Sequence, residues 1–242
     1  MPVDLHKEIK KAVKHFWKTR ETQKSKQEKI GKKDQGARGS VTGGAQLDGF
    51  INLTKKLLIN EGIPENSIYL KSRITLPGFF RPTKEWDLLV VHDSNLIASL
   101  EFKSHIGPSF GNNFNNRTEE ALGNATDLWT AYRESVFLES IRPWLGFFLI
   151  LEDHPESRAS VTAKEPHFPV MEEFKDSSYA RRYELFCHRL IRERLYDAAC
   201  LILSDRTDGK KGAFSEPSSL INFETFAASL TAKANAYMKF HR

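Results

Sequence analysis

The feature that most constrains the fold is a pair of short apolar stretches on either side of Asp93-Ser94-Asn95. Residues 85–92 and 96–103 are rich in β-branched and large apolar side chains, which is typical of strands. The three polar residues between them are typical of a tight turn. The sequence therefore predicts a β-hairpin with a three-residue loop.

The register of this hairpin gathers charged side chains at its open end. A three-residue loop makes His92 face Leu96, and counting outward along the ladder places Asp87 opposite Glu101. Directly opposed residues have Cβ atoms about 4.5 to 5.5 Å apart. Lys103 follows Glu101 by two residues and projects from the same face. The other face is expected to be apolar, with Trp86, Leu88, Val90, Ala98, Leu100 and Phe102.

The remaining pattern predicts helices around a mixed sheet. Apolar periodicity indicates helices at 4–29, 47–60, 116–133, 178–194 and 224–240, and further strands at 67–75, 144–151 and 198–204. A strand, a long helix and a strand in succession predict a parallel pair. The expected fold class is therefore α/β, with a mixed central β-sheet flanked by helices.

We expect one domain over residues 1–242. Its parts are a basic N-terminal helix and arm at 1–40 and the α/β core at 41–205. The proline-containing segment 152–177 is expected to be an irregular surface excursion.

Positive charge is concentrated at the N-terminus. Residues 1–40 contain twelve Lys or Arg and five Asp or Glu, so this arm has a net charge of +7, while the rest of the chain has −2. Such an arm suits a polyanion, because each lysine that neutralises a phosphate releases counterions. The alternative is a solvated, Lys-rich helix face.

Several protein classes are disfavoured by composition. No apolar run approaches the roughly 18 residues of a membrane span, and no signal peptide is recognisable, so a cytoplasmic protein without a membrane partner is expected. Cys187 and Cys200 lack the spacing of zinc sites. We expect both cysteines to serve packing only.

The charged hairpin end suggests a metal centre. Buried charges are costly unless they are paired or bind a metal. Asp87 and Glu101 would repel each other, and a hard cation such as Mg²⁺ bound to both would remove this repulsion. The ion would polarise a water and a phosphate oxygen, and Lys103 would orient or deprotonate that water or stabilise charge on the phosphate. The alternative is a structural ion pair of Lys103 with one carboxylate.

These residues resemble a known nuclease signature. Asp87 with Glu101-Phe102-Lys103 is similar to the PD-(D/E)xK motif, although Trp86 stands where that motif has Pro. The predicted helix, hairpin, helix and strand order is similar to the core of that restriction-endonuclease-like superfamily. The surrounding sequence, with the segments Glu85–Asp87, Glu101–Ser104, Ile106–Arg117 and the loop Gly36–Gly49, resembles the XhoI-type type II restriction endonucleases.

The resemblance implies an activity. It implies a homodimer that hydrolyses both strands of double-stranded DNA at a palindrome, for this family CTCGAG, cut after the first C to leave a four-base 5′ overhang. A cognate DNA methyltransferase is then expected in the host, with no direct contact implied.

Candidate DNA-binding residues follow the hairpin directly. Asn pairs bidentately with adenine and Arg with guanine in the major groove. The candidates are Arg38 in the Gly-rich loop and, in the expected loop after Lys103, Asn112, Asn113, Asn115, Asn116 and Arg117. The alternative is a loop of turn-forming residues in which Asn116 caps the next helix.

Two further residues are candidate accessory groups. The superfamily resemblance suggests an acid from the helix preceding the sheet, here Asp48, which could equally be a solvent-exposed residue favoured by the helix dipole. His105 is a candidate acid or base, with a hydrogen-bonded structural histidine as the alternative. Other acidic residues are expected to face solvent: Glu119, Glu120, Asp127 and Glu134 on the following helix, and the turn Glu152-Asp153. For Glu152-Asp153 the alternative is membership of a metal site.

Three functions therefore compete. The first is a site-specific restriction endonuclease. The second is a nuclease with the same core and another task, such as repair. The third is a DNA-binding protein without catalysis, in which the charged residues form a structural cluster.

Overall fold

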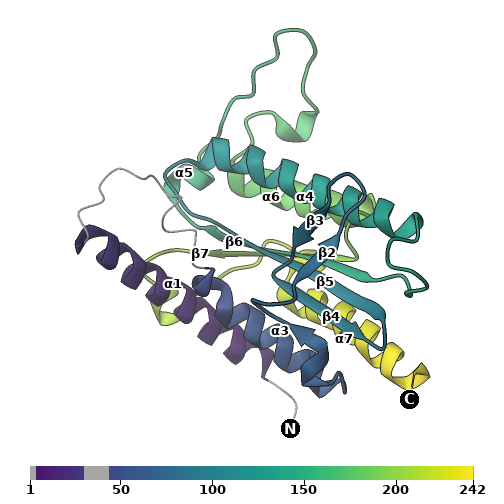
Figure 1. Cartoon of the computed structure of the whole chain (residues 1–242). Helices are drawn as coiled ribbons and strands as arrows, with labels where there is room; N and C mark the ends of the chain where they lie inside the picture. The colour runs from purple at the N-terminus through teal and green to yellow at the C-terminus, as the bar shows by residue number, and fades with distance from the viewer. Residues whose placement is uncertain (1–3, 30–43, 242) are drawn as a thin grey trace.

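The computed structural model describes residues 4–29 and 44–241, which form three layers around a mixed sheet (Figure 1). The five strands lie in the order β1-β4-β5-β6-β7. β1, β4 and β5 are antiparallel neighbours, whereas β5, β6 and β7 are parallel. Their bounds are β1 (Ile68–Tyr69), β4 (Leu88–His92), β5 (Asn95–His105), β6 (Trp144–Glu152) and β7 (Ala198–Ser204). The expected α/β class with a mixed sheet is confirmed.

Helices cover both faces of this sheet. Figure 1 shows α1 (Leu5–Lys29), α3 (Asp48–Asn60) and α7 (Phe223–Phe240) on one face, and α4 (Phe110–Arg133) with α6 (Tyr179–Arg192) on the other. β6 is buried along its whole length. Phe148 packs in the core beneath α1, α3 and α7, and Phe147 packs beneath α4 and α6. A strand covered on both sides reads as a continuous apolar run, and this explains the sequence of β6.

The predicted hairpin forms with a different turn. The turn consists of Asp93 and Ser94 alone, with φ values of 46° and 60°, and His92 pairs with Asn95. A two-residue turn with positive φ at both positions matches the strand twist. The expected three-residue loop and the pairing of His92 with Leu96 are therefore wrong.

A β-bulge restores the predicted register farther along the hairpin. The pairing shifts between Val90 and Val91, after which Val90 faces Ala98 and Leu88 faces Leu100. The extra residue in β5 compensates for the shorter turn. The predicted register therefore holds as far as Leu88 and Leu100, the last pair of the ladder before Asp87 and Glu101.

The strand expected over 85–92 is interrupted. β4 begins only at Leu88, and the chain bends at Trp86 and Asp87. Trp86 packs in the core under α4 and α6, whereas Leu88 packs in the core on the other face. The expectation that Trp86 and Leu88 share a face is wrong, because the bend breaks the two-residue alternation.

A second, two-stranded sheet lies before this bend. It pairs β2 (Thr75–Pro77) with β3 (Thr83–Glu85). The strand expected over 67–75 shrinks to β1, because Lys71 and Arg73 have positive φ values of 63° and 55°, which extended strands do not adopt.

α4 begins six residues earlier than predicted, at Phe110. Most of the expected recognition loop is therefore helix. The other helices and parallel strands agree with the predictions within a few residues. The short helices are η1 (Ala45–Leu47), η2 (Glu65–Ser67), α5 (Pro155–Arg158), η3 (Glu172–Phe174), η4 (Gly209–Lys211) and η5 (Ser219–Ile221).

Three smaller features complete the described structure. The segment after β6 projects from the body as a largely irregular excursion, as Figure 1 shows. Cys187 and Cys200 are free and buried, as expected for packing residues. Within residues 4–29 and 44–241, no helix combines the length and the apolar character needed to cross a membrane.

Candidate active site

Asp87 lies in the bend before β4, so that β5 continues past Leu100 without a paired residue of β4. Its backbone N–H donates to the Leu100 carbonyl at 3.2 Å, and its Oδ2 accepts the Phe102 N–H at 2.7 Å. The side chain thus replaces a missing strand carbonyl for Phe102. Burial raises the pKa of Asp87, although nearby Lys103 and the Phe102 amide act in the opposite direction.

Glu101 is the most enclosed charged residue in the described part of the chain, with 1% of its surface exposed. Its Oε1 lies 2.7 Å from Nζ of Lys103 and 3.5 Å from Nζ of Lys84. Asn124 Nδ2 donates to both carboxylate oxygens, at 2.9 and 2.7 Å. Burial alone would raise the pKa of Glu101, but the two ammonium groups outweigh it and the pKa is lowered. Glu101 therefore stays charged at neutral pH.

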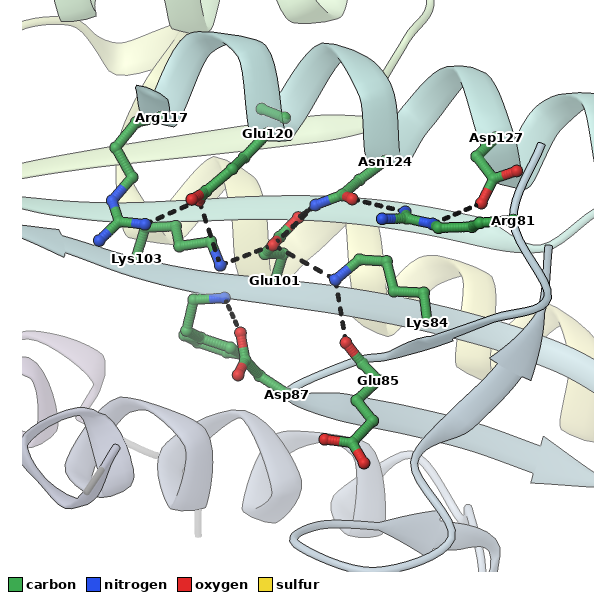
Figure 2. Close-up of polar contacts among 12 residues, drawn as sticks. Arg81, Lys84, Glu85, Asp87, Glu101, Lys103, Arg117, Glu120, Asn124 and Asp127 are labelled. Atoms are coloured by element: carbon green, nitrogen blue, oxygen red, sulfur yellow. Dashed lines mark hydrogen bonds and ion pairs between the residues drawn. The ribbon is translucent and has the colours of Figure 1, made fainter. Parts of the chain in front are cut away.

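Lys103 links the buried carboxylate to α4 (Figure 2). Its Nζ also lies 3.7 Å from Glu120 Oε2, which in turn lies 2.7 Å from Nη1 of Arg117. Burial opposes the charge of Lys103, but Glu101 and Asp87 outweigh it and raise the pKa of this ammonium. The ion pair thus holds the charged Lys103 ammonium against Glu101, and the nearby Asp87 carboxylate favours the same charge.

A pocket of about 440 Å³ opens beside these groups. Asp87 and Lys103 line it, together with Asp48 from the first turn of α3 and Arg117 from α4. Asp48 also forms an ion pair with Lys71 at 3.1 Å. Asp48 is thus brought to the pocket, whereas Glu101 is not among the residues that line it.

The donor atoms suit a hard divalent cation. Asp87 and Glu101 offer carboxylate oxygens, and Oδ1 of Asp87 accepts no hydrogen bond from any residue that the structure describes. No group of three or more His, Cys, Asp or Glu side chains in the described ranges could hold a metal ion. Mg²⁺ commonly binds through one or two carboxylates and keeps several waters, so two carboxylates suffice. At Glu101 the cation would compete with the Lys103 ammonium.

The candidate DNA-reading residues lie on the first two turns of α4, not in a loop. Asn112, Asn115 and Asn116 are exposed there, and Asn113 is half-buried. The helix begins after Ser109, so Asn116 does not cap it. Arg117 lines the pocket and Asn115 donates to Glu119 at 2.7 Å. Arg38 lies outside the described residues.

His105 is a buried histidine away from the pocket. Its Nδ1 lies 2.7 Å from the Tyr183 hydroxyl, and its ring packs against Phe110. Burial, with a smaller effect of Arg117, lowers the pKa of His105 to about 4. The imidazole is therefore neutral at physiological pH.

This lowered pKa predicts acid sensitivity. The unfolded chain binds a proton at His105 near pH 6.5, whereas the folded chain does so only near pH 4. Stability is thus unaffected above pH 6.5 and is lost as pH falls toward 4, by about 1.4 kcal/mol per pH unit. We expect His105→Gln to reduce the loss of free energy of unfolding between pH 7 and pH 5 by about 2 kcal/mol. Denaturant unfolding at both pH values measures it, with exposed His167→Gln as the control; equal losses in both variants would contradict the prediction.

Several buried polar residues were not predicted as part of the site. Asn124 and Asp127 are each only 5% exposed, so the expectation that Asp127 faces solvent is wrong. Both lie on the buried face of α4 with Ala121 and Leu128. Polar residues at positions of the apolar stripe could have indicated this burial from the sequence. Lys84 gave no local signal, because its contact with Glu101 depends on the tertiary fold.

The turn after β6 also differs from expectation. Glu152 is buried, forms an ion pair with Arg206, and accepts the Gly107 N–H at 3.0 Å. The prediction of an exposed Glu152-Asp153 turn is therefore wrong for Glu152. Glu119, Glu120 and Glu134 are exposed, as expected.

Comparison with known proteins shows extensive similarity to one family. The model of the restriction endonuclease XhoI family matches residues 26–216. The type II restriction enzyme BstVI of Geobacillus stearothermophilus is 49% identical over 203 residues, which cover 82% of this chain and 91% of that enzyme. The type II restriction enzyme XhoI of Xanthomonas vasicola is 43% identical over 181 residues, covering 74% of this chain and 72% of that enzyme.

A third relative, the type II restriction enzyme AbrI of Azospirillum brasilense, is 49% identical over 166 residues, covering 68% of this chain and 74% of that enzyme. No solved structure gives a significant match. The extent of these matches places the chain among the type II restriction endonucleases, a class of site-specific deoxyribonucleases. Within that class, it belongs to the XhoI restriction endonuclease family.

Proposed function

We propose that this restriction endonuclease hydrolyses phosphodiester bonds of double-stranded DNA with Mg²⁺, using Asp87, Glu101 and Lys103. The observation that supports this most strongly is the junction of a buried carboxylate (Glu101), a half-buried carboxylate (Asp87) and one charged lysine beside an open pocket. Elsewhere in a protein, such a cluster would cost stability without an evident gain.

Asp87 and Glu101 would provide the ligands for the metal. Bound there, Mg²⁺ supplies a polarised water and withdraws charge from a phosphate oxygen. The hydrogen bond from Phe102 to Asp87 fixes one carboxylate, and Asn124 fixes the other. Lys103, whose Nζ is shared between Glu101 and Glu120, can stabilise negative charge on the reacting phosphate or orient the water.

The proposed substrate site is the palindrome CTCGAG, cut after the first C to leave a 5′ overhang, as the family resemblance implies. A palindrome has twofold symmetry, so a homodimer with one active site for each strand is proposed. We propose the cytoplasm as the enzyme's compartment. A cognate methyltransferase would protect the host DNA without contacting this chain.

The exposed start of α4 is the proposed surface for reading bases. The helix N-terminus carries positive dipole charge, which favours approach to phosphates. The asparagines there can present amide groups to base edges. The proposed DNA-binding residues are Asn112, Asn113, Asn115, Asn116, Arg117 and, in the Gly-rich loop, Arg38. The basic N-terminal arm would add affinity for phosphates without sequence selection.

Plasmid cleavage tests this function directly. A plasmid with CTCGAG sites, incubated with the protein and Mg²⁺, is expected to give discrete fragments whose ends begin at TCGAG. A matched plasmid with each site changed by one base pair should stay intact, and so should the original plasmid with a chelator. Fragments from both plasmids would indicate a nuclease with another task, and a gel shift without cleavage would indicate a DNA-binding protein.

A further inference from the structure

We propose that Asn124 is a positioning residue for Glu101, held in place by Arg81 and Asp127. This inference rests on the proposed function of Glu101 as a metal ligand. We define Glu101, Asn124, Arg81 and Asp127 as the carboxylate relay; Figure 2 shows it running from β5 to α4 and the β2–β3 turn.

The first link of the relay fixes the orientation of the carboxylate. Asn124 Nδ2 lies within hydrogen-bond distance of both oxygens of Glu101, whereas both lysine contacts are made to Oε1. The terminal torsion of a glutamate is broad and weakly restrained by itself. Hydrogen bonds must therefore set the plane of the Glu101 carboxylate, and Asn124 is the described partner of Oε2.

The second link fixes the amide of Asn124. Its Oδ1 accepts a hydrogen bond from Nη2 of Arg81 at 2.6 Å. Because a guanidinium can only donate, it identifies the oxygen side of the amide and directs Nδ2 toward Glu101. Arg81 thus determines which group Asn124 presents to the carboxylate.

The third link attaches the β2–β3 turn to α4. Oδ2 of Asp127 accepts from Nε of Arg81 at 2.8 Å, and its Oδ1 accepts the backbone N–H groups of Phe79 and Phe80, each at 2.8 Å. A Cβ atom at Gly78 would lie 2.5 Å from Asp127 Oδ2 and 2.7 Å from the Arg81 carbonyl, so the turn can approach closely only with glycine there. One buried aspartate therefore holds the turn and its arginine together.

The hydrogen bonds of Asn124 matter most when the Lys103 ammonium contacts a DNA phosphate. Lys103 is the only one of the three Glu101 partners that also lines the pocket. If its ammonium moves to a phosphate, Asn124 still holds the carboxylate in the orientation that a metal requires. Partners of metal ligands commonly change metal affinity or activity by about 10- to 100-fold when they are removed.

The test uses the full chain with Asn124→Ala and, as a milder change, Arg81→Lys. Arg81→Lys keeps the charge but loses the planar geometry that joins Asn124 and Asp127. We expect Asn124→Ala to weaken Mn²⁺ binding, followed by electron paramagnetic resonance without DNA, by about 10-fold or more. We expect the Mg²⁺ concentration for half-maximal cleavage to rise in parallel, and Arg81→Lys to show smaller shifts in the same direction. DNA binding in the absence of metal should be unchanged.

Arg142→Lys is the matched control, because Arg142 forms an ion pair with Asp197 at 2.7 Å and does not line the pocket. It should leave both metal readouts unchanged. Circular dichroism and thermal melting show whether each variant folds. If Asn124→Ala does not fold, the metal readouts of Arg81→Lys test the proposal instead. If both variants fold and keep the wild-type Mn²⁺ affinity and Mg²⁺ requirement for cleavage, the proposed role of Asn124 is overturned and the proposed function stands. A wild-type protein that neither binds Mn²⁺ nor cuts DNA would overturn the proposed function itself.

Discussion

Replacing Asp87 with Asn is expected to lower the rate of DNA cleavage by at least about 10³-fold, equivalent to about 4 kcal/mol in the activation barrier. The amide oxygen of Asn can still accept the Phe102 N–H, so the local backbone geometry is retained. The negative charge that would bind the cation is lost. Single-turnover cleavage of a CTCGAG duplex at saturating Mg²⁺ measures the change.

The same substitution is expected to leave the protein equally or more stable. Burial raises the pKa of Asp87, so the folded state disfavours its charged form at neutral pH. A neutral Asn avoids that cost, and the melting temperature should stay level or rise. Lost activity without lost stability is the result expected of a functional carboxylate.

Asp197→Asn provides a matched control for Asp87→Asn. Asp197 also accepts a backbone amide, from Leu145 at 2.8 Å, but it lies outside the pocket and forms an ion pair with Arg142. This control should cleave DNA at close to the wild-type rate. Near-normal cleavage by Asp87→Asn would remove Asp87 from the proposed metal site.

The hairpin shows how far sequence reasoning reached. The opposition of Asp87 and Glu101 was predicted from a three-residue loop, whereas the structure has a two-residue turn and a bulge at Val90 and Val91. The two shifts of one residue cancel, so the predicted register holds from Val90 and Ala98 to Leu88 and Leu100, the last pair before Asp87 and Glu101. The local turn geometry could not be read from Asp93-Ser94-Asn95, because these polar residues suit both two- and three-residue loops.

The missed features depend on contacts between distant parts of the chain. The run of asparagines before residue 117 has low helix propensity, yet α4 begins at Phe110, whose ring packs against His105 and Tyr179. Tertiary packing therefore extends the helix. Likewise, Asp127 is buried because the β2–β3 turn folds onto it, and no pattern within α4 predicts that partner.

Lys103 and Lys84 both contact Oε1 of Glu101, and their substitution should separate catalysis from charge balance. Lys103→Met is expected to slow cleavage by about 10²- to 10⁴-fold, the range typical of a positioned acid, base or charge-stabilising group. Lys103 lines the pocket with Asp87, so its ammonium can meet a bound phosphate. The measurement is again single-turnover cleavage of the CTCGAG duplex.

Lys84→Met is expected to slow cleavage by about 10-fold, the low end of the range for partners of metal ligands, because its Nζ lies 3.5 Å from Glu101 Oε1. Its Nζ donates to the Glu85 carbonyl at 2.9 Å, lies over the ring of Trp86, and does not line the pocket. Each substitution removes one positive charge from buried Glu101 and so raises its pKa. In both variants the acid limb of the pH–rate profile should therefore move to higher pH. If the acid limb shifts in both variants but the rate falls strongly only in Lys103→Met, then Lys103 is the catalytic lysine and Lys84 is a counterion of Glu101. The opposite ranking would assign the catalytic role to Lys84 and show that the E-x-K spacing had pointed to the wrong lysine.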